Sequence, residues 1–538
     1  MIEVCEKPVR EWIEKAAKLR FIQRIWQKDA SLWTRDPEGQ KEVRNRLGWL
    51  FAPQKMKDAA PDLRSFAEEI KELFNQVVLL GMGGSSLASE VIQHVFGNKP
   101  GYPVLVVLDS TDPERIRDVE ADLDLAKTLF IVSSKSGGTI ELVSLFKHFF
   151  EKVKVLKGEK AGEQFVAITD PGTQLDELAR TRSFRKTFLN PEDVGGRFSA
   201  LTYFGLVPAA LIGVDVSKVL AGAERMAHAC SPETSAADNP GLLLGAGMAV
   251  LAEAGRDKLT ILTSKGLESF GDWAEQLVAE STGKEDLGIV PVVREPEALS
   301  EEYGEDRFFV ALLEGNGKSA GVEALARDLE KAGHPVFTLR FEDPHELGAE
   351  FFRWEMATAV ACALLKVNAF DQPDVQAAKD RTKAILKKAG SGGGIAAAPE
   401  IAVSSMLAEA GPGDYIGILA FLPDRDLVRK TLVELQREIR RRSKKAVTLG
   451  IGPRYLHSTG QLHKGGANNG IFIVITTAHQ NDLPIPGDPF SFAQLELAQA
   501  MGDFEALKKK GRRVFHFRLP DLSEKSLGAL SDRIKSSL

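Results

Sequence analysis

Short apolar runs alternate with longer amphipathic segments along almost the whole chain. In the first part of the chain, runs rich in valine, isoleucine and leucine cover 77–80, 104–108, 129–132 and 165–169. A second set covers 259–263, 308–313, 336–341, 416–421, 446–451, 471–476 and 514–517. Apolar strands without polar alternation are typical of parallel sheets that are covered on both faces, and regular strand–helix alternation is typical of doubly wound sheets. The pattern therefore predicts an α/β protein with parallel-rich sheets.

The same pattern suggests three segments. Residues 1–70 have helical patterns with four tryptophans, which predicts a helical N-terminal extension. Residues 71–215 and 216–538 each hold one set of strands, so we expect two α/β/α sandwich domains, the second with helical connectors and C-terminal elements. The glycine-rich stretch 390–394 is expected to be a hinge or a surface insertion.

Composition narrows the choice of partners. The chain has 538 residues, of which 43% are hydrophobic and 27% charged, with a formal net charge of -6. This balance does not favour binding to nucleic acid or to an anionic membrane. One basic cluster, made of Arg437, 440–442 and 444–445, is interpreted as a solvated helix end. No apolar stretch has bilayer length and no signal-peptide pattern is present, so we expect a cytoplasmic protein.

Cysteine and histidine positions indicate no metal chemistry. Cys5, Cys230 and Cys362 lie far apart and form no paired motif, which fits a reducing compartment. None of the nine histidines has the HExxH spacing of a zinc site. These positions therefore predict no metal site.

The most informative polar stretch follows the apolar run 129–132. Hydroxyl side chains, a lysine and two glycines crowd into one turn, and a helical pattern then begins at Ile140. Backbone N–H groups at a helix N-terminus favour an anion, and open α/β sheets bind ligands at the carboxyl ends of their strands. The sequence predicts a site for the phosphate of a small metabolite, with the candidate ligands Ser134, Lys135, Ser136 and Thr139.

A second loop of this kind joins the run 77–80 to another helical pattern. Its glycines allow close approach of a ligand, and Gly84 and Ser85 are the candidate binding residues. The loop lacks the spacing of dinucleotide and nucleotide phosphate loops. A tight turn without a ligand is the alternative interpretation.

Six motifs together resemble those of glucose-6-phosphate isomerases. They are the glycine-serine loop 81–85, the phosphate loop 134–139, Gly-Gly-Arg-Phe-Ser at 195–199, a glutamate motif at 276–284, a lysine motif at 370–379 and His-Ser-Thr-Gly-Gln at 457–461. The resemblance is strongest to the isomerase portion of bifunctional transaldolase/glucose-6-phosphate isomerases, here without a transaldolase domain. It implies two sugar-isomerase domains, a homodimer, a phosphosugar substrate and no cofactor. Association with a separate transaldolase is a further expectation.

The resemblance also assigns roles. Glu280 is expected to move a proton between C2 and C1 of the open sugar through a cis-enediol, with Gln276 one helical turn earlier on the same face. The permanent charge of Arg197 suits a developing enediolate. A solvated helix glutamate, as we expect Glu275 to be, and a surface arginine are the structural alternatives.

Two more residues are expected to act on the sugar ring. Pro373 fits the first position of a helix, which would place Gln372 and Lys379 on one face near the ring oxygen and hydroxyls. An imidazole side chain in general titrates near neutrality, which makes His457 the candidate for proton transfer during ring opening. The alternative for Lys379 is an exposed helix lysine without a role in the site. The alternative for His457 is a histidine that only bonds to a backbone carbonyl. His463 and Lys464 lie close enough in sequence to take the role of His457.

The order of the motifs departs from the family. In most members the histidine motif precedes the lysine motif, whereas here Lys379 comes before His457. The role of His457 therefore depends on the fold returning it to the site, or on a second subunit supplying it. Asp374 and Gln376 also replace the usual glycine and glutamate of the lysine motif.

Two other functions fit the same residues. One is an isomerase that acts on both glucose 6-phosphate and mannose 6-phosphate. The other is a non-catalytic phosphosugar sensor, against which stands the intact motif around Glu280.

Overall fold

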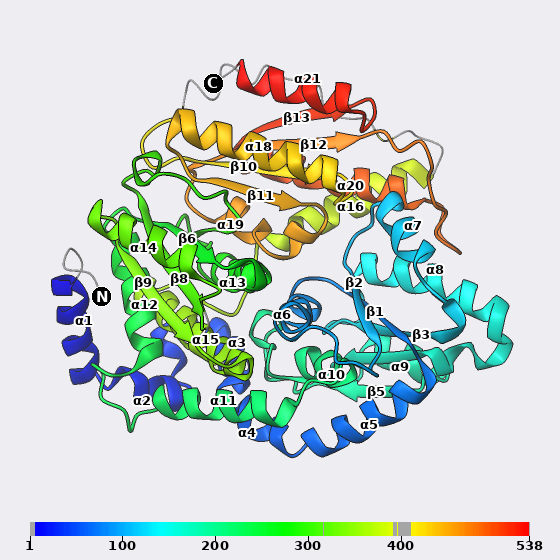
Figure 1. The fold of residues 1–538 in the computed structure, drawn as a ribbon, viewed down its shortest axis with the longest axis horizontal. Helices are drawn as coiled ribbons and strands as arrows, with labels where there is room; N and C mark the ends of the chain where they lie inside the picture. Colours follow the sequence, from blue (N-terminus) through cyan, green and yellow to red (C-terminus); the bar gives the residue numbers. More distant parts are fainter. Residues whose placement is uncertain (1–5, 316, 391–394, 396–409, 537–538) are drawn as a thin grey trace.

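Three parallel β-sheets surround a common centre (Figure 1). The computed structural model describes residues 6–315, 317–390, 395 and 410–536. The predicted α/β class with parallel sheets is confirmed. Most of the glycine-rich stretch 390–394 lies outside the described residues, so its interpretation as a hinge stays a prediction.

Helices form the first part of the chain. They are α1 (Glu6–Lys18), α2 (Phe21–Trp26), α3 (Pro37–Arg44), α4 (Ala52–Lys57) and α5 (Ala60–Leu73). Their tryptophans anchor them to later parts of the chain, because the indole of Trp33 donates to the carbonyl of Ala359 (2.8 Å) and that of Trp26 to the carbonyl of Cys230 (3.0 Å). The helices therefore support the central helices as well as the first sheet.

The first sheet positions both predicted loops. Its strand order is β2 (Val104–Leu108), β1 (Gln76–Gly81), β3 (Thr128–Ser133), β4 (Phe165–Thr169) and β5 (Lys186–Leu189). The helices that follow its strands are α6 (Leu87–Phe96), α7 (Pro113–Ala121), α8 (Ile140–Lys157), α9 (Gln174–Thr181) and α10 (Tyr203–Leu211). Because β1 and β3 are parallel neighbours, the loops at their carboxyl ends lie side by side.

Two further sheets follow residue 216, where the sequence led us to expect one domain. Their strands, in spatial order, are β7 (Val290–Val292), β6 (Lys258–Thr263), β8 (Arg307–Glu314) and β9 (Val336–Phe341), then β11 (Val447–Ile451), β10 (Tyr415–Phe421), β12 (Gly470–Thr477) and β13 (Arg513–Leu519). The helices of this part are α11 (Val216–Ala229), α12 (Pro240–Glu253), α13 (Glu268–Thr282), α14 (Ala320–Lys331), α15 (Leu347–Leu365), α16 (Val375–Gly390), α18 (Asp426–Ser443), α19 (Gly460–Gly465), α20 (Phe492–Lys509) and α21 (Glu524–Lys535). The domain boundaries at 70 and 215 stay a prediction.

Side chains explain why the last two sheets do not merge. At the edge of β11, the N–H of Val447 donates to Glu295 (3.2 Å), and Arg307 donates to the carbonyl of Lys445 (3.0 Å). Arg307 and Glu295 are themselves a buried pair at 2.6 Å. Edge groups that would otherwise accept another strand are therefore satisfied by charged side chains.

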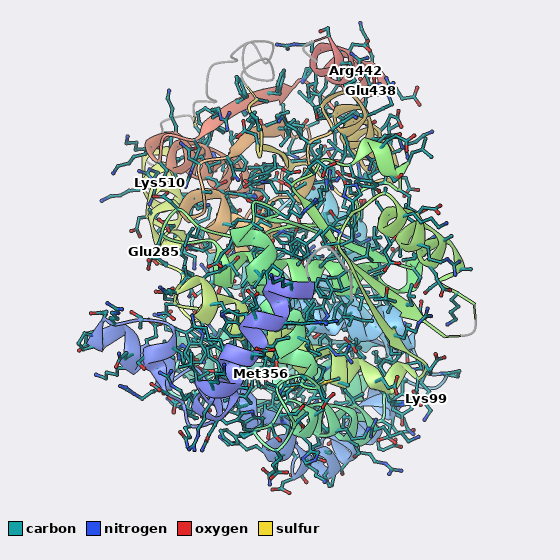
Figure 2. The ribbon with its side chains drawn as sticks, turned by 90° about the vertical axis from the view of Figure 1, so that its left-hand side faces the viewer. Lys99, Glu285, Met356, Glu438, Arg442 and Lys510 are labelled. Carbon is teal, nitrogen blue, oxygen red and sulfur yellow. The ribbon has the colours of Figure 1, made fainter. Side chains whose placement is uncertain are left out.

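The expectation about the basic cluster at Arg437, 440–442 and 444–445 is only partly correct, because one of its arginines is buried next to Glu295. Arg442 pairs with Glu438 at the surface (2.6 Å), and Figure 2 shows the two side by side at one end of the molecule. Arg440, by contrast, is buried, with guanidinium nitrogens 3.8 Å from Glu295 and 3.6 Å from Glu302. The cluster is thus a solvated helix end only in part.

Within the described ranges, we find no helix that is both long and apolar enough to cross a bilayer.

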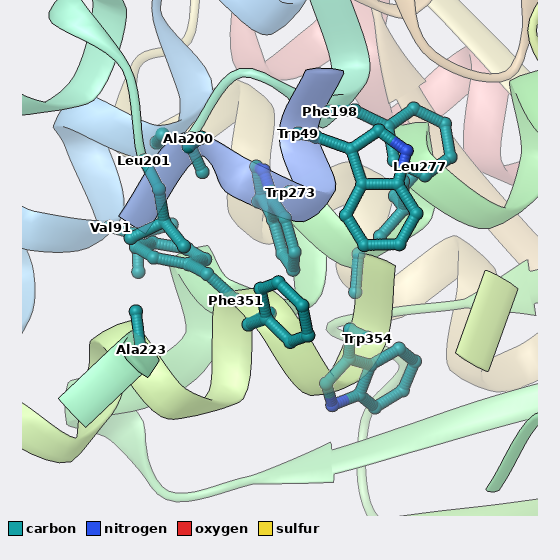
Figure 3. Close-up of a cluster of buried hydrophobic side chains, with 14 of the residues drawn as sticks. Trp49, Val91, Phe198, Ala200, Leu201, Ala223, Trp273, Leu277, Phe351 and Trp354 are labelled. Carbon is teal, nitrogen blue, oxygen red and sulfur yellow. The ribbon is translucent and has the colours of Figure 1, made fainter. Parts of the chain in front are cut away.

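Aromatic side chains form the core beneath the site (Figure 3). The rings of Trp273 on α13 and Phe351 on α15 are 4.7 Å apart, and Trp49 stacks on Phe198 at 5.4 Å. All four are buried. This packing fixes α13, the helix that carries Gln276 and Glu280, and holds Phe198 next to Arg197.

Truncating this core is expected to destabilise the protein. Phe351→Ala should lower the free energy of unfolding by about 3–5 kcal/mol, because the large buried cavity cannot collapse fully. Urea unfolding followed by tryptophan fluorescence measures the loss. Leu299→Ala, at a side chain that is 65% exposed, is the control and should change it by less than about 0.5 kcal/mol. Equal effects of the two substitutions would contradict this account of the core.

Candidate active site

The glycine-serine loop is the meeting point of three distant segments. Ser133, at the end of β3, donates to the carbonyl of Ser85 (2.9 Å). Gly83 has a positive φ of 55°, and a Cβ there would lie 2.7 Å from the carbonyl oxygen of His457. A Cβ on Gly84 would lie 2.1 Å from the carbonyl oxygen of Gly196. Glycine is therefore required at both positions by close backbone approach.

The phosphate loop is preorganised around the start of α8. The Ser134 hydroxyl lies 3.2 Å from the Thr139 hydroxyl and accepts a hydrogen bond from the N–H of Gly137 (3.1 Å). Thr139 occupies the N-cap position of α8 without a capping bond from its side chain. Ser136 and Thr139 line a cavity of about 510 Å³. A helix N-terminus with hydroxyl side chains at a cavity wall suits a phosphate monoester.

Lys135 has a different place from the neighbouring hydroxyls. Its ammonium group pairs with Asp170 and donates to the carbonyl of Glu192 (3.2 Å). Lys135 is not among the residues that line the cavity. The ammonium group is thus engaged with Asp170 and Glu192 and does not line the cavity as Ser136 and Thr139 do.

A charged network surrounds Glu280 on α13. The buried Arg197 places a guanidinium nitrogen 3.2 Å from Glu280, and the same nitrogen donates to Gln372 (3.0 Å). Further bonds run from Arg197 to the hydroxyl of Ser281 (2.8 Å) and to the carbonyl of Asp371 (2.9 Å). The guanidinium is therefore held at several points, and its Nη1 faces the predicted base.

Gln276 joins this network to the histidine segment. Its side-chain amide lies one turn before Glu280 and donates both to the Glu280 carboxylate (3.0 Å) and to the backbone carbonyl of His457 (2.8 Å). The structure thus brings Arg197, Glu280, Gln276 and Gln372 together. It also places the backbone carbonyl of His457, in the same chain, in contact with Gln276.

His457 lines the same cavity, and its imidazole contacts an acidic partner. Its Nε2 is 2.8 Å from Glu141, and the amide of Gln499 donates to the same carboxylate oxygen (2.7 Å). Burial would raise the pKa of Glu141, but the charges of His457 and Lys379 hold that pKa below its usual value. The ionised Glu141 therefore orients the histidine ring.

Asp374 explains how the displaced histidine motif is held. Gln461, in that motif, accepts from the N–H of Asp374 (2.9 Å) and donates to the Asp374 carboxylate (2.8 Å) and to the carbonyl of Gly283 (3.0 Å). The residue that departs from the family pattern thus links the histidine, lysine and glutamate motifs.

Lys379 lines the cavity from α16, together with Ser136, Thr139 and His457. The prediction that Pro373 begins this helix is wrong, because α16 begins at Val375. Gln372 lies in the preceding turn, where its side chain reaches Arg197 instead of sharing a helix face with Lys379. The residues before Val375, which we expected to begin the helix, are not helical, and Gln372 among them is held by Arg197.

The neighbours of His457 do not compete for its role. His463 is buried, its ring is 4.7 Å from that of Phe472, and burial holds its pKa well below the usual value. Lys464 lines the cavity, but its ammonium group is paired with the buried Asp503 at 2.6 Å. Of the two histidines, only His457 lines the cavity, and the ammonium group of Lys464 is already paired.

Two functional candidates escaped the sequence analysis. Glu141 lies in the first turn after the phosphate loop, where an acidic residue is common at any helix N-terminus. Gln499 lies within α20, and no motif marks it.

Glu275 was expected to be solvated, yet it is half-buried and accepts from the hydroxyl of Ser458 (3.2 Å), and burial raises its pKa to about 8.

The chain resembles proteins of one family. Residues 51–295 match the family model described as phosphoglucose isomerase. This range contains Gly84, Arg197, Gln276 and Glu280, whereas Lys379 and His457 lie beyond it.

Named relatives and a solved structure extend the match. A glucose-6-phosphate isomerase of Carboxydothermus hydrogenoformans is 29% identical over 406 residues, which cover 65% of this chain and 87% of the relative. One of Methanocaldococcus jannaschii is 30% identical over 353 residues, or 59% and 85% of the two chains. The crystal structure of a hypothetical protein of Thermus thermophilus superposes with a TM-score of 0.61 at 26% identity, covering 70% of this chain and 97% of that one. This chain belongs to the phosphoglucose isomerase family.

Proposed function

We propose that the protein interconverts glucose 6-phosphate and fructose 6-phosphate. The observation that carries the proposal is the placement of the Glu280 carboxylate between Arg197 and Gln276. Gln276 also contacts the backbone of His457, and His457 lines a cavity together with residues of the phosphate loop. The membership in the isomerase family supports the same reaction.

Binding begins at the phosphate. The N–H groups at the start of α8 and the hydroxyls of Ser134, Ser136 and Thr139 receive the phosphoryl oxygens. This anchor directs the sugar toward Lys379 and His457, which share the cavity with it.

Ring opening is assigned to His457 and Lys379. Opening a cyclic sugar requires a proton to reach the ring oxygen and another to leave the anomeric hydroxyl. An imidazole oriented by Glu141 can carry one of these protons at neutral pH, and the ammonium group of Lys379 stabilises negative charge at the sugar oxygens.

Isomerisation is assigned to Glu280. Its carboxylate removes the proton from C2 of the open aldose, the C–H electron pair forms the C1–C2 double bond, and the π electrons of the C1 carbonyl move to O1. Arg197 stabilises the cis-enediolate that develops. The same carboxyl then returns a proton to C1, while the hydroxyl proton of O2 is lost and O1 gains one, which yields the ketose. The hydrogen stays within the substrate and its oxidation level is unchanged, so the scheme calls for no redox cofactor.

Replacing the base should abolish turnover but not binding. We expect Glu280→Gln to lower kcat at least about 10³-fold, because the amide cannot accept the C2 proton. The rate is measured as NADP reduction from fructose 6-phosphate, coupled through glucose-6-phosphate dehydrogenase. Glu268→Gln, on the same helix with a side chain that is 42% exposed, is the matched control and should keep the wild-type kcat.

The same assay separates the enzyme from a phosphosugar sensor. A wild-type protein that binds fructose 6-phosphate in calorimetry, yet turns over no faster than Glu280→Gln, would support the sensor and contradict the proposal. Parallel assays with mannose 6-phosphate test the dual-specificity alternative.

The phosphate loop should govern KM. Thr139→Val is expected to raise KM about 10-fold or more with a smaller change in kcat, because it removes a hydroxyl donor to a charged ligand. Inhibition by inorganic phosphate should weaken in parallel. Thr181→Val, at the exposed end of α9, is the control. An unchanged phosphate inhibition constant in Thr139→Val would place the phosphate elsewhere.

We propose further that the protein is a cytoplasmic homodimer, and that it can associate with a separate transaldolase. The family resemblance is the support for these statements. Light scattering of the purified protein and a pull-down with transaldolase test them.

A further inference from the structure

A second cluster of chemically active side chains lies outside the proposed isomerase site. Asp112 is at the N-cap of α7, His479 follows β12, and Glu496 lies on α20. Nε2 of His479 is 2.5 Å from Oε2 of Glu496 and 4.0 Å from Oδ2 of Asp112. One ligand atom from each of the three lies within 4.8 Å of the others.

The two carboxylates are buried with part of their bonding capacity unused. Asp112 is fully buried, and its Oδ1 accepts from the N–H groups of Glu114 and Arg115, both at 2.8 Å. Its Oδ2, which faces His479, has no hydrogen-bond partner among the described residues, and neither has Oε1 of the buried Glu496. Two acids thus share one imidazole in a buried site, which is costly without further positive charge.

We propose that Asp112, His479 and Glu496 bind one divalent transition-metal cation of the zinc class. An imidazole nitrogen with two carboxylate oxygens is a donor set that such cations accept. Metal–ligand distances of about 2.0–2.2 Å imply ligand atoms about 3.4 Å apart in a tetrahedral site. The separations of 2.5 Å and 4.0 Å bracket this value, so shifts below about 1 Å would complete the site.

Access to the cluster is available from one side. His479 and Glu496 line a cavity of about 210 Å³, together with Thr477 and Arg518. The cavity offers an entry path and room for a water molecule as a fourth ligand.

The cation would connect elements of the first and third sheets close to the contacts that hold His457. Figure 1 shows α7, which is part of the first sheet's layer of helices, beside α20, which packs against the third sheet. Asp112 is the N-cap residue of α7, and Glu496 lies on α20. Thr111, adjacent to Asp112, donates to Gln499 (2.8 Å), which lies one turn after Glu496 and donates to Glu141. The cation would therefore stabilise the contact that positions Glu141 without touching substrate.

Metal binding by the intact protein is the first test. After removal of bound metal with a chelator and dialysis against Zn²⁺, we expect about one zinc per chain by mass spectrometry and a Tm raised by about 3 °C or more. Co²⁺ should give the visible absorption bands of a low-symmetry nitrogen–oxygen site. Binding below about 0.1 equivalent, with no change in Tm, would overturn the proposal and leave a protonated histidine bridging the acids.

Conservative variants locate the ion. Asp112→Asn keeps the helix cap and Glu496→Gln keeps an acceptor for His479, yet each should weaken zinc binding at least about 100-fold and remove the Tm shift. Glu120→Gln, which alters the His148–Glu120 pair (3.0 Å), is the matched control and should bind like the wild type. Wild-type affinity in both ligand variants would place the ion elsewhere and overturn the proposal. If a variant does not fold, the wild-type stoichiometry and cobalt spectrum still decide. These readouts do not depend on isomerase activity.

Discussion

The hydrogen bond from Gln276 to the backbone carbonyl of His457 connects the parts of the molecule on which the site depends. Gln276 lies on the central helix α13, and His457 follows a strand of the third sheet. Glycine at position 83 lets the first sheet approach both residues, because a Cβ would lie 2.7 Å from the His457 carbonyl and 2.8 Å from the Gln276 amide. Three sheets are thereby held at one point.

Charges arranged around this contact give the site its chemistry. Arg197 and Gln276 bind the two oxygens of the Glu280 carboxylate from different sides, so the base has a fixed orientation. Glu141 does the same for the imidazole of His457. In the proposed reaction, each reactive group is thus held by a partner that is itself buried, which would keep reorganisation small. The core of tryptophan and phenylalanine beneath α13 provides the rigid support.

Much of this arrangement was accessible from the sequence, because it is written in local patterns. The eleven apolar runs predicted as strands are strands in the structure, whereas β5 and β7 were missed. β5 begins with Lys186 and Thr187 and so has only two apolar residues, and β7 has three residues with Pro291 in the middle. The motifs around Arg197 and Glu280 identified the central residues of the proposed site. What could not be predicted are long-range contacts: Glu141 with Gln499, Asp374 with Gln461, and the cluster of Asp112, His479 and Glu496. No spacing rule links residues that meet only after three sheets have packed. The separation of the last two sheets was equally hidden, since it depends on side chains of Glu295 and Arg307 at the edge of β11.

A crystal structure with arabinonate 5-phosphate, an analogue of the enediolate, tests the central claim most directly. We expect phosphoryl oxygens about 2.7–3.1 Å from the Thr139 hydroxyl and the first N–H groups of α8. The carboxylate of Glu280 should face the acid group of the ligand, and His457 of the same chain should reach the opposite part of it. A ligand bound with its phosphate elsewhere, or with Glu280 too distant for proton transfer, would contradict the account.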